Sequence, residues 1–293
     1  MRPPFTDAHM HLWDSLEPGL SYYWLAPGGD ELETGIMGEY GAVRSERYAA
    51  EDYIAETRFH NVDRVIHVQS ADANPADPLV EARWVNAFHE RLGVPHAIIG
   101  YVDLAAPTAR EVIDMHLEID IFRGVRDLRA DDYLENPDWE VGVACLAEHE
   151  LAICDEFPIE KAELAVGIAR RNPGLTFCLD HALFPRFERE GDFERWRDAL
   201  RTLAAAPNMV IKISALGMVE RRWTPDLLRR RILTCIEAFG VERSFFAANW
   251  PMDRLYSSFG DLLDCFDEVT SDFSEVERHA LFNANAKRIF KLD

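Results

Sequence analysis

The chain has 293 residues, of which 48% are hydrophobic and 28% charged, and this composition is typical of a folded globular protein rather than a disordered one. A chain of this length can bury a large core, so it needs no disulfide or metal to fold. Its formal net charge of −21 argues against nucleic acids and anionic membranes as partners, because both are polyanions.

Five cysteines are present, and no two of them form a C-x-x-C pair. An odd number of unpaired thiols is typical of a reducing compartment. The first residues do not have the pattern of a signal peptide, and no apolar run reaches the ~18 residues of a membrane-spanning helix. We therefore expect a cytoplasmic protein.

Short β-rich runs recur along the whole chain and are separated by segments of helical length. Eight such runs are predicted as strands: 5–11, 64–70, 96–103, 122–128, 151–157, 175–181, 209–214 and 244–250. Helical periodicity fills intervening segments such as 78–92, 159–171 and 225–239. Alternating strands and helices indicate a parallel sheet, and eight units predict a closed (β/α)₈ barrel, which often uses about 250 residues as one domain. We expect one domain over residues 1–293.

The connection after the first strand is unusually long, at about residues 14–50. It contains Gly28 and Gly29 and the aromatic residues Tyr22, Tyr23 and Trp24. Long loops in compact domains often cover binding sites, so we expect this loop to lie over the barrel mouth, with Tyr23 and Trp24 contacting substrate. The alternative is a surface loop that has no role in binding.

The carboxyl ends of barrel strands face the active-site mouth, which selects candidate residues. The first strand ends in Asp7-x-His9-x-His11, and residues two apart on a strand point to the same side. The sixth ends in His181. Three imidazoles from these positions can ligate Zn²⁺ or Mn²⁺.

Further candidates end the other strands. They are Gln69 on the second, Arg126 on the fourth, Glu156 on the fifth and Asn249 on the eighth. Lys212 and Ser214 alternate with apolar residues on the seventh strand, where packing inside the barrel is the simpler interpretation.

Several motifs together resemble the amidohydrolase superfamily, specifically its amidohydrolase-related branch of lactonases acting on sugar lactones and 2-pyrone-4,6-dicarboxylate. They are FTDAHMHLWD, VIHVQS, IIGYVDLAAP, FRGVR, LDHALFP, KISALGM and FFAANWPMDRLYSSF, in that order along nearly the whole chain. The resemblance implies a histidine pair at His9 and His11, a third histidine at His181, and an arginine, Arg126, that holds a substrate carboxylate or carbonyl. It also implies an aspartate base at position 249, where this chain has Asn249.

An amide cannot accept a proton from water as a carboxylate does, so another base is needed. Asp253, four residues further on, and Glu156 are the candidates. The branch includes enzymes with and without a metal, and the sequence leaves both open for a divalent ion held by His9, His11 and His181.

We therefore expect a hydrolase that opens a small lactone of a sugar acid or of an aromatic-degradation intermediate, with a small molecule as its partner. A decarboxylase or hydratase of an aromatic acid, and a catalytically silent ligand-binding barrel, stay open as alternatives, as does assembly into a homo-oligomer.

Overall fold

Eight parallel strands form one sheet in a computed structural model that describes residues 2–26, 35–127 and 133–292. The glycine pair Gly28 and Gly29 and the expected strand end at residue 128 lie outside the described residues. In sheet order the strands are β1 (Phe5–Met10), β4 (Val62–Val68), β5 (Ala97–Tyr101), β6 (Phe122–Arg126), β7 (Ala152–Asp155), β8 (Thr176–Leu179), β9 (Met209–Ile213) and β10 (Ser244–Phe246).

The first and last strands meet, so the sheet nearly closes on itself. Met10 and Trp250 form a parallel bridge, and the His11 amide donates to the Trp250 carbonyl at 2.8 Å. Seven of the eight runs expected from the sequence contain one of these strands, and β4 begins at Val62, two residues before the run expected at 64–70. The predicted (β/α)₈ barrel is therefore confirmed.

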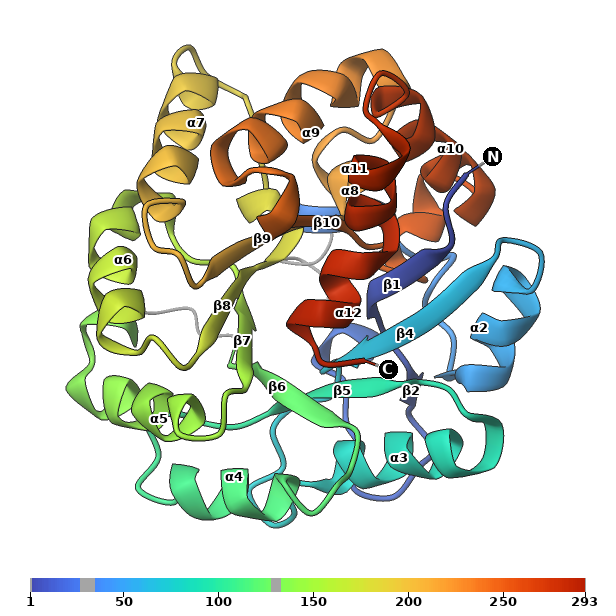
Figure 1. Ribbon diagram of the computed structural model, residues 1–293. Helices are drawn as coiled ribbons and strands as arrows, with labels where there is room; N and C mark the ends of the chain where they lie inside the picture. The colour runs from blue at the N-terminus through green and yellow to red at the C-terminus, as the bar shows by residue number, and fades with distance from the viewer. Residues whose placement is uncertain (1, 27–34, 128–132, 293) are drawn as a thin grey trace.

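Helices surround the strands on the outside, as Figure 1 shows in a view along the barrel. The α-helices of the described residues are α2 (Ala50–Thr57), α3 (Val80–Leu92), α4 (Ala109–His116), α5 (Pro137–Ala147), α6 (Ala162–Arg171), α7 (Asp192–Leu203), α8 (Leu216–Val219), α9 (Pro225–Phe239), α10 (Phe259–Val269), α11 (Glu275–His279) and α12 (Asn285–Ile289). Local sequence explains several ends: α9 begins with a proline behind the capping side chain of Thr224, and α3 stops at Gly93, which has a φ of 73°. Among the described helices, none combines the length and apolarity needed to cross a bilayer.

The C-terminal helix α12 closes one end of the barrel. Phe290, just after it, packs edge to face on Phe245 of β10 and joins an inner core of small strand residues such as Ala8 and Ala152. This end holds the amino ends of the strands, so the opposite end is left for a site.

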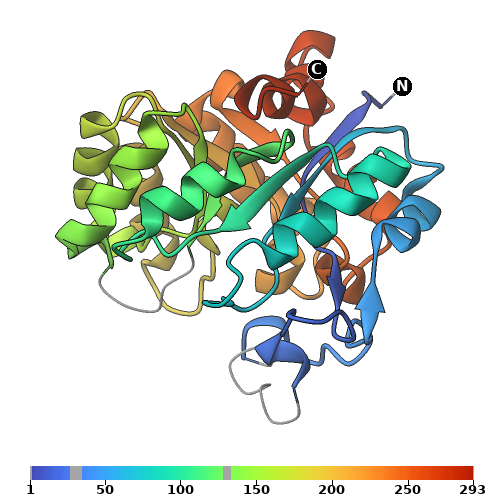
Figure 2. The same cartoon turned by 90° about the horizontal axis from the view of Figure 1, so that it is seen from below.

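The long connection lies at that opposite end, seen below the barrel in Figure 2. Its base is an antiparallel pair, β2 (Trp13–Asp14) and β3 (Arg47–Tyr48). Trp13 anchors the described part of the loop by stacking on Tyr48 and meeting the Trp24 ring at 5.0 Å between centroids.

Candidate functional site

A cavity of about 200 Å³ opens between the strand ends and the long loop. Its lining residues are His11, Tyr23, Trp24, Ile36, Met37, Gln69, Ser70, Arg126, Glu156, His181, Phe184, Met218, Asn249 and Met252. Eight of the ten residues expected from the sequence are in this set, and the other two, His9 and Asp253, are buried next to it.

The three histidines lie together at the floor of this cavity. The Nε2 atoms of His9 and His11 are 3.1 Å apart, and the rings of His9 and His181 lie 4.4 Å apart between centroids. His11 Nδ1 donates to the Val68 carbonyl at 2.9 Å, which leaves a lone pair on its Nε2. Nδ1 of His181 contacts Ser214 Oγ at 2.9 Å.

All three imidazoles are held neutral. Burial is the main cause that lowers the pKa of each histidine well below its usual value. The positive charge of Arg126 adds to this at His11 and His181, and that of Lys212 at His9. Neutral imidazole is the form that binds a metal.

Two sets of donors here have a spacing that suits a divalent ion such as zinc: the pair His9 and His11, and a cluster of His9, His181 and Asp180 that does not include His11. Two nitrogens on one tetrahedral zinc, each at 2.0–2.1 Å, lie about 3.3 Å apart, close to the 3.1 Å between His9 and His11. Ligand atoms of His9, His181 and Asp180 lie within 4.8 Å of one another. The Val68 carbonyl orients the His11 ring, as outer partners of metal-binding histidines commonly do.

Beneath the histidines lies a charge pair that the sequence did not predict. Lys212 Nζ is 2.8 Å from Asp180 Oδ1, and neither side chain is exposed. His9 Nδ1 lies 3.3 Å from Lys212 Nζ and 3.4 Å from Asp180 Oδ2. Burial opposes the charge on Lys212, but Asp180 outweighs it and raises the pKa of the lysine. His9 Nδ1 is therefore in contact with both members of a buried ion pair, the Lys212 ammonium and the Asp180 carboxylate.

Nothing in the sequence singles out Asp180, which follows an apolar run and comes directly before His181. For Lys212 the sequence favours packing inside the barrel. It does lie inside the barrel, but its ammonium contacts the candidate site.

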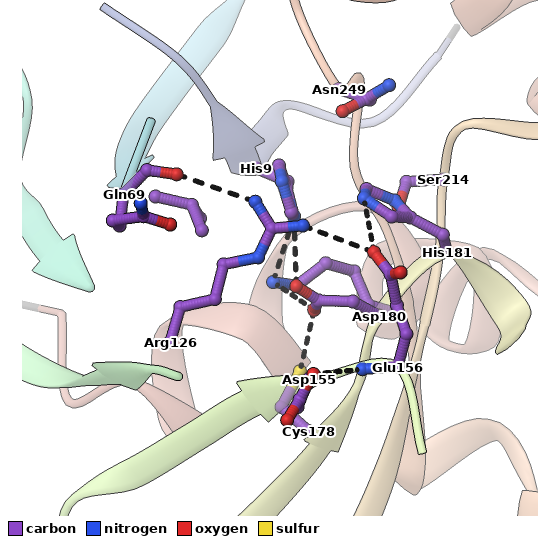
Figure 3. A network of polar contacts seen from close by, with 12 residues as sticks. His9, Gln69, Arg126, Asp155, Glu156, Cys178, Asp180, His181, Ser214 and Asn249 are labelled. Carbon is purple, nitrogen blue, oxygen red and sulfur yellow. Dashed lines mark hydrogen bonds and ion pairs between the residues drawn. The ribbon is translucent and has the colours of Figure 1, made fainter. Parts of the chain in front are cut away.

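On the cavity wall, Glu156 stands between a cation and a histidine (Figure 3). Its Oε1 lies 3.1 Å from Arg126 Nη2 and 3.5 Å from His181 Nε2. Burial raises the pKa of Glu156 to about 7, although Arg126 opposes this. Arg126 Nε is buried without a hydrogen-bond partner among the described residues.

Asn249 lies above His9 and His181 in the same view, and its amide group is hydrogen-bonded to the protein. Its Nδ2 donates to Asp253 Oδ2 at 2.7 Å and contacts Met218 Sδ at 3.2 Å. Asp253 is 1% exposed and does not line the cavity, and burial raises its pKa to about 7. Of the two expected bases, the structure thus brings only Glu156 to the cavity wall.

The chain turns sharply after β8 to form this part of the site. Residues 181–184 have φ between 46° and 58°, a left-handed conformation that non-glycine residues rarely adopt in sequence. The Trp196 indole donates to the Ala182 carbonyl at 2.8 Å and holds the turn. Such strain is typical of functional sites, and here it places His181 and Phe184 at the cavity.

Comparison with known proteins shows the family of the chain. The amidohydrolase family model matches residues 6–292, so the chain belongs to the amidohydrolase family and is a hydrolase of that family. The uncharacterised protein y4mH of Sinorhizobium fredii is 33% identical, with 98% of each chain covered.

An L-fucono-1,5-lactonase of Burkholderia ambifaria is 28% identical, over 98% of this chain and 95% of its own. An amidohydrolase of Burkholderia multivorans, solved once with bound HEPES and once with bound zinc, superposes with TM-scores of 0.82 and 0.81 at 22% identity, covering 99% of this chain and 100% of its own.

Proposed function

We propose that this protein opens a small lactone by hydrolysis. The observation that carries the proposal is the position of Glu156, a carboxyl on the cavity wall within 3.5 Å of both Arg126 and His181. The lactonase relative, similar over almost the whole length of both chains, supports a cyclic ester as the substrate.

Each group in the cavity has a place in this reaction. Arg126 donates to the carbonyl oxygen of the lactone, where negative charge develops as water adds. Glu156 takes a proton from the attacking water, and a hydroxyl group forms on the carbonyl carbon. The ring C–O bond then breaks, and Glu156 returns the proton to the leaving ring oxygen, which gives a hydroxy acid.

His9, His11 and His181 would hold a divalent ion such as Zn²⁺ or Mn²⁺. When bound, such an ion supplies Lewis acidity toward the carbonyl and lowers the pKa of water. Without a charged group at position 249 the donor set has less electrostatic attraction for the ion, so an Asn249→Asp variant should bind zinc more tightly.

The remaining cavity residues hold the substrate. Asn249, fixed by its bond to Asp253, presents its carbonyl oxygen, and Gln69 lines the cavity beside Arg126. Tyr23 and Trp24 from the long loop form the outer wall and act as a lid over a small-molecule substrate.

The test is a turnover screen of the purified chain against a panel of lactones, with metal content measured on the same sample. Ring opening releases acid, so a pH indicator reports it directly. We expect opening of at least one five- or six-membered lactone, which Glu156→Gln should suppress and Glu160→Gln, at a position outside the cavity, should not. Decarboxylation of aromatic acids with no lactone opened would refute the proposal.

A further inference from the structure

Much of the polar surface of the cavity is already bonded to the protein itself. Ser70 Oγ lies 2.7 Å from the Leu12 carbonyl and 3.0 Å from Glu81, and the Asn249 amide donates to Asp253. The Gln69 amide donates to the Ala71 carbonyl. These groups are therefore less available to a ligand that carries many hydroxyl groups.

The rest of the described wall is mostly apolar. Its members come from the long loop and from the segments after β8, β9 and β10: Trp24, Ile36, Met37, Phe184, Met218 and Met252. Three of these are methionines, whose flexible, polarisable side chains adapt to apolar groups of varied shape.

The charge in the cavity is balanced. Arg126 is the one arginine or lysine among the described lining residues, and Glu156 pairs with it at 3.1 Å. A substrate carboxylate would have to compete with Glu156 for this cation and would lie near its negative charge.

From this wall we infer the substrate class: an uncharged lactone with an alkyl or aryl substituent, rather than a polyhydroxylated sugar lactone or a carboxylated pyrone. The inference rests on the proposed lactone-opening function. The carbonyl faces Arg126 and the histidines, and the apolar substituent packs on the methionine and aromatic wall. Each ring hydroxyl that loses water here without a new partner should lower kcat/KM roughly tenfold.

The experiment compares kcat/KM for three six-membered substrates: an alkyl-substituted δ-lactone, L-fucono-1,5-lactone and 2-pyrone-4,6-dicarboxylate. We expect kcat/KM for the alkyl lactone to exceed that for each of the others by about 100-fold or more. This is the effect of two or more substrate polar groups that lose water and find no new partner in the cavity. A preference for the sugar lactone or the dicarboxylate would overturn the inference and leave lactone hydrolysis standing.

A matched pair of variants tests the wall directly. Met252→Gln adds a hydrogen-bonding group to the cavity, while Met115→Gln makes the same change on the exposed side of α4. Met252→Gln should shift the kcat/KM ratio toward the sugar lactone by about tenfold, and Met115→Gln should not. Equal ratios in both variants and the parent would count against the wall as the source of selectivity.

Binding of ketone analogues, which cannot be hydrolysed, separates the two proposals. Calorimetry should show tighter binding of an alkylcyclohexanone than of a polyhydroxylated cyclohexanone. If the alkyl ketone binds but no lactone is opened, the proposed hydrolysis fails while the apolar recognition holds. Tighter binding of the hydroxylated ketone would refute the apolar recognition.

Discussion

The buried pair Lys212 and Asp180 gives a sharp test of the electrostatics under the histidines. Lys212→Met keeps most of the length of the side chain and removes its charge, at a position with no solvent exposure. At 2.8 Å and an effective dielectric constant near 20, the attraction between the two charges is about 6 kcal/mol. Desolvation of both ions offsets much of this gain.

Removing one partner has a different effect from removing both. Lys212→Met leaves the Asp180 carboxylate buried without its counter-charge, so we expect a loss of about 3–5 kcal/mol in the free energy of unfolding. In a double variant that also carries Asp180→Asn no buried charge of this pair is left, and at least ~2 kcal/mol of that loss should be regained.

Urea unfolding followed by circular dichroism measures both free energies at neutral pH. His9, which lies 3.3 Å from the ammonium, provides a second readout, because its ring ¹⁵N shifts report the tautomer. The pair would be shown not to stabilise the protein if the free energy of unfolding of Lys212→Met lay within ~1 kcal/mol of the parent's. The same would follow if the double variant were no more stable than the single one.

Three further outcomes are expected. Glu156→Gln should lower kcat by about 10²–10⁴ with little change in KM, as for loss of a general base, whereas Glu160→Gln outside the cavity should leave kcat unchanged; equal losses in the two would remove the base from Glu156. Burial raises the pKa of Asp253 from 3.8 to about 7, so the protein is stabilised by keeping this acid protonated. The contribution of Asp253 to the free energy of unfolding is fully present below pH 3.8 and is lost as the pH rises through about 7. The advantage of Asp253→Asn over the parent in free energy of unfolding should therefore grow by up to roughly 4 kcal/mol between pH 4 and pH 8, while the exposed control Asp226→Asn should show no such trend; a flat difference for Asp253 would contradict its burial as an acid. Trp24→Leu should raise KM about tenfold through loss of the lid wall, and an unchanged KM would exclude this loop from substrate binding.

The sequence predicted the barrel because its signals are local and repeated. Strand runs alternate with helical runs, and each strand end points to one mouth, so the positions of His11, Arg126 and Glu156 followed from chain order alone. The histidine pair at the end of β1 needed only the two-residue period of a strand.

The missed residues depend on geometry that has no local signal. Strand β8 ends at Leu179, not at His181 as expected, and the chain then takes a left-handed turn without glycine, which directs Asp180 inward. Lys212, which pairs with Asp180, comes from β9 and lies 32 positions further along the chain. Nothing in either segment alone reports that the two charges meet inside the barrel.

The pairing of Asn249 with Asp253 determines which charges reach the cavity wall. The Asn249 amide donates to the Asp253 carboxyl group at 2.7 Å, so this acid lies behind the amide and not on the cavity wall. Glu156 is thus the one carboxyl group among the described lining residues. Because Glu156 pairs with Arg126, the wall that faces the substrate is close to neutral, which is the condition under which an uncharged lactone would be preferred over a carboxylated one.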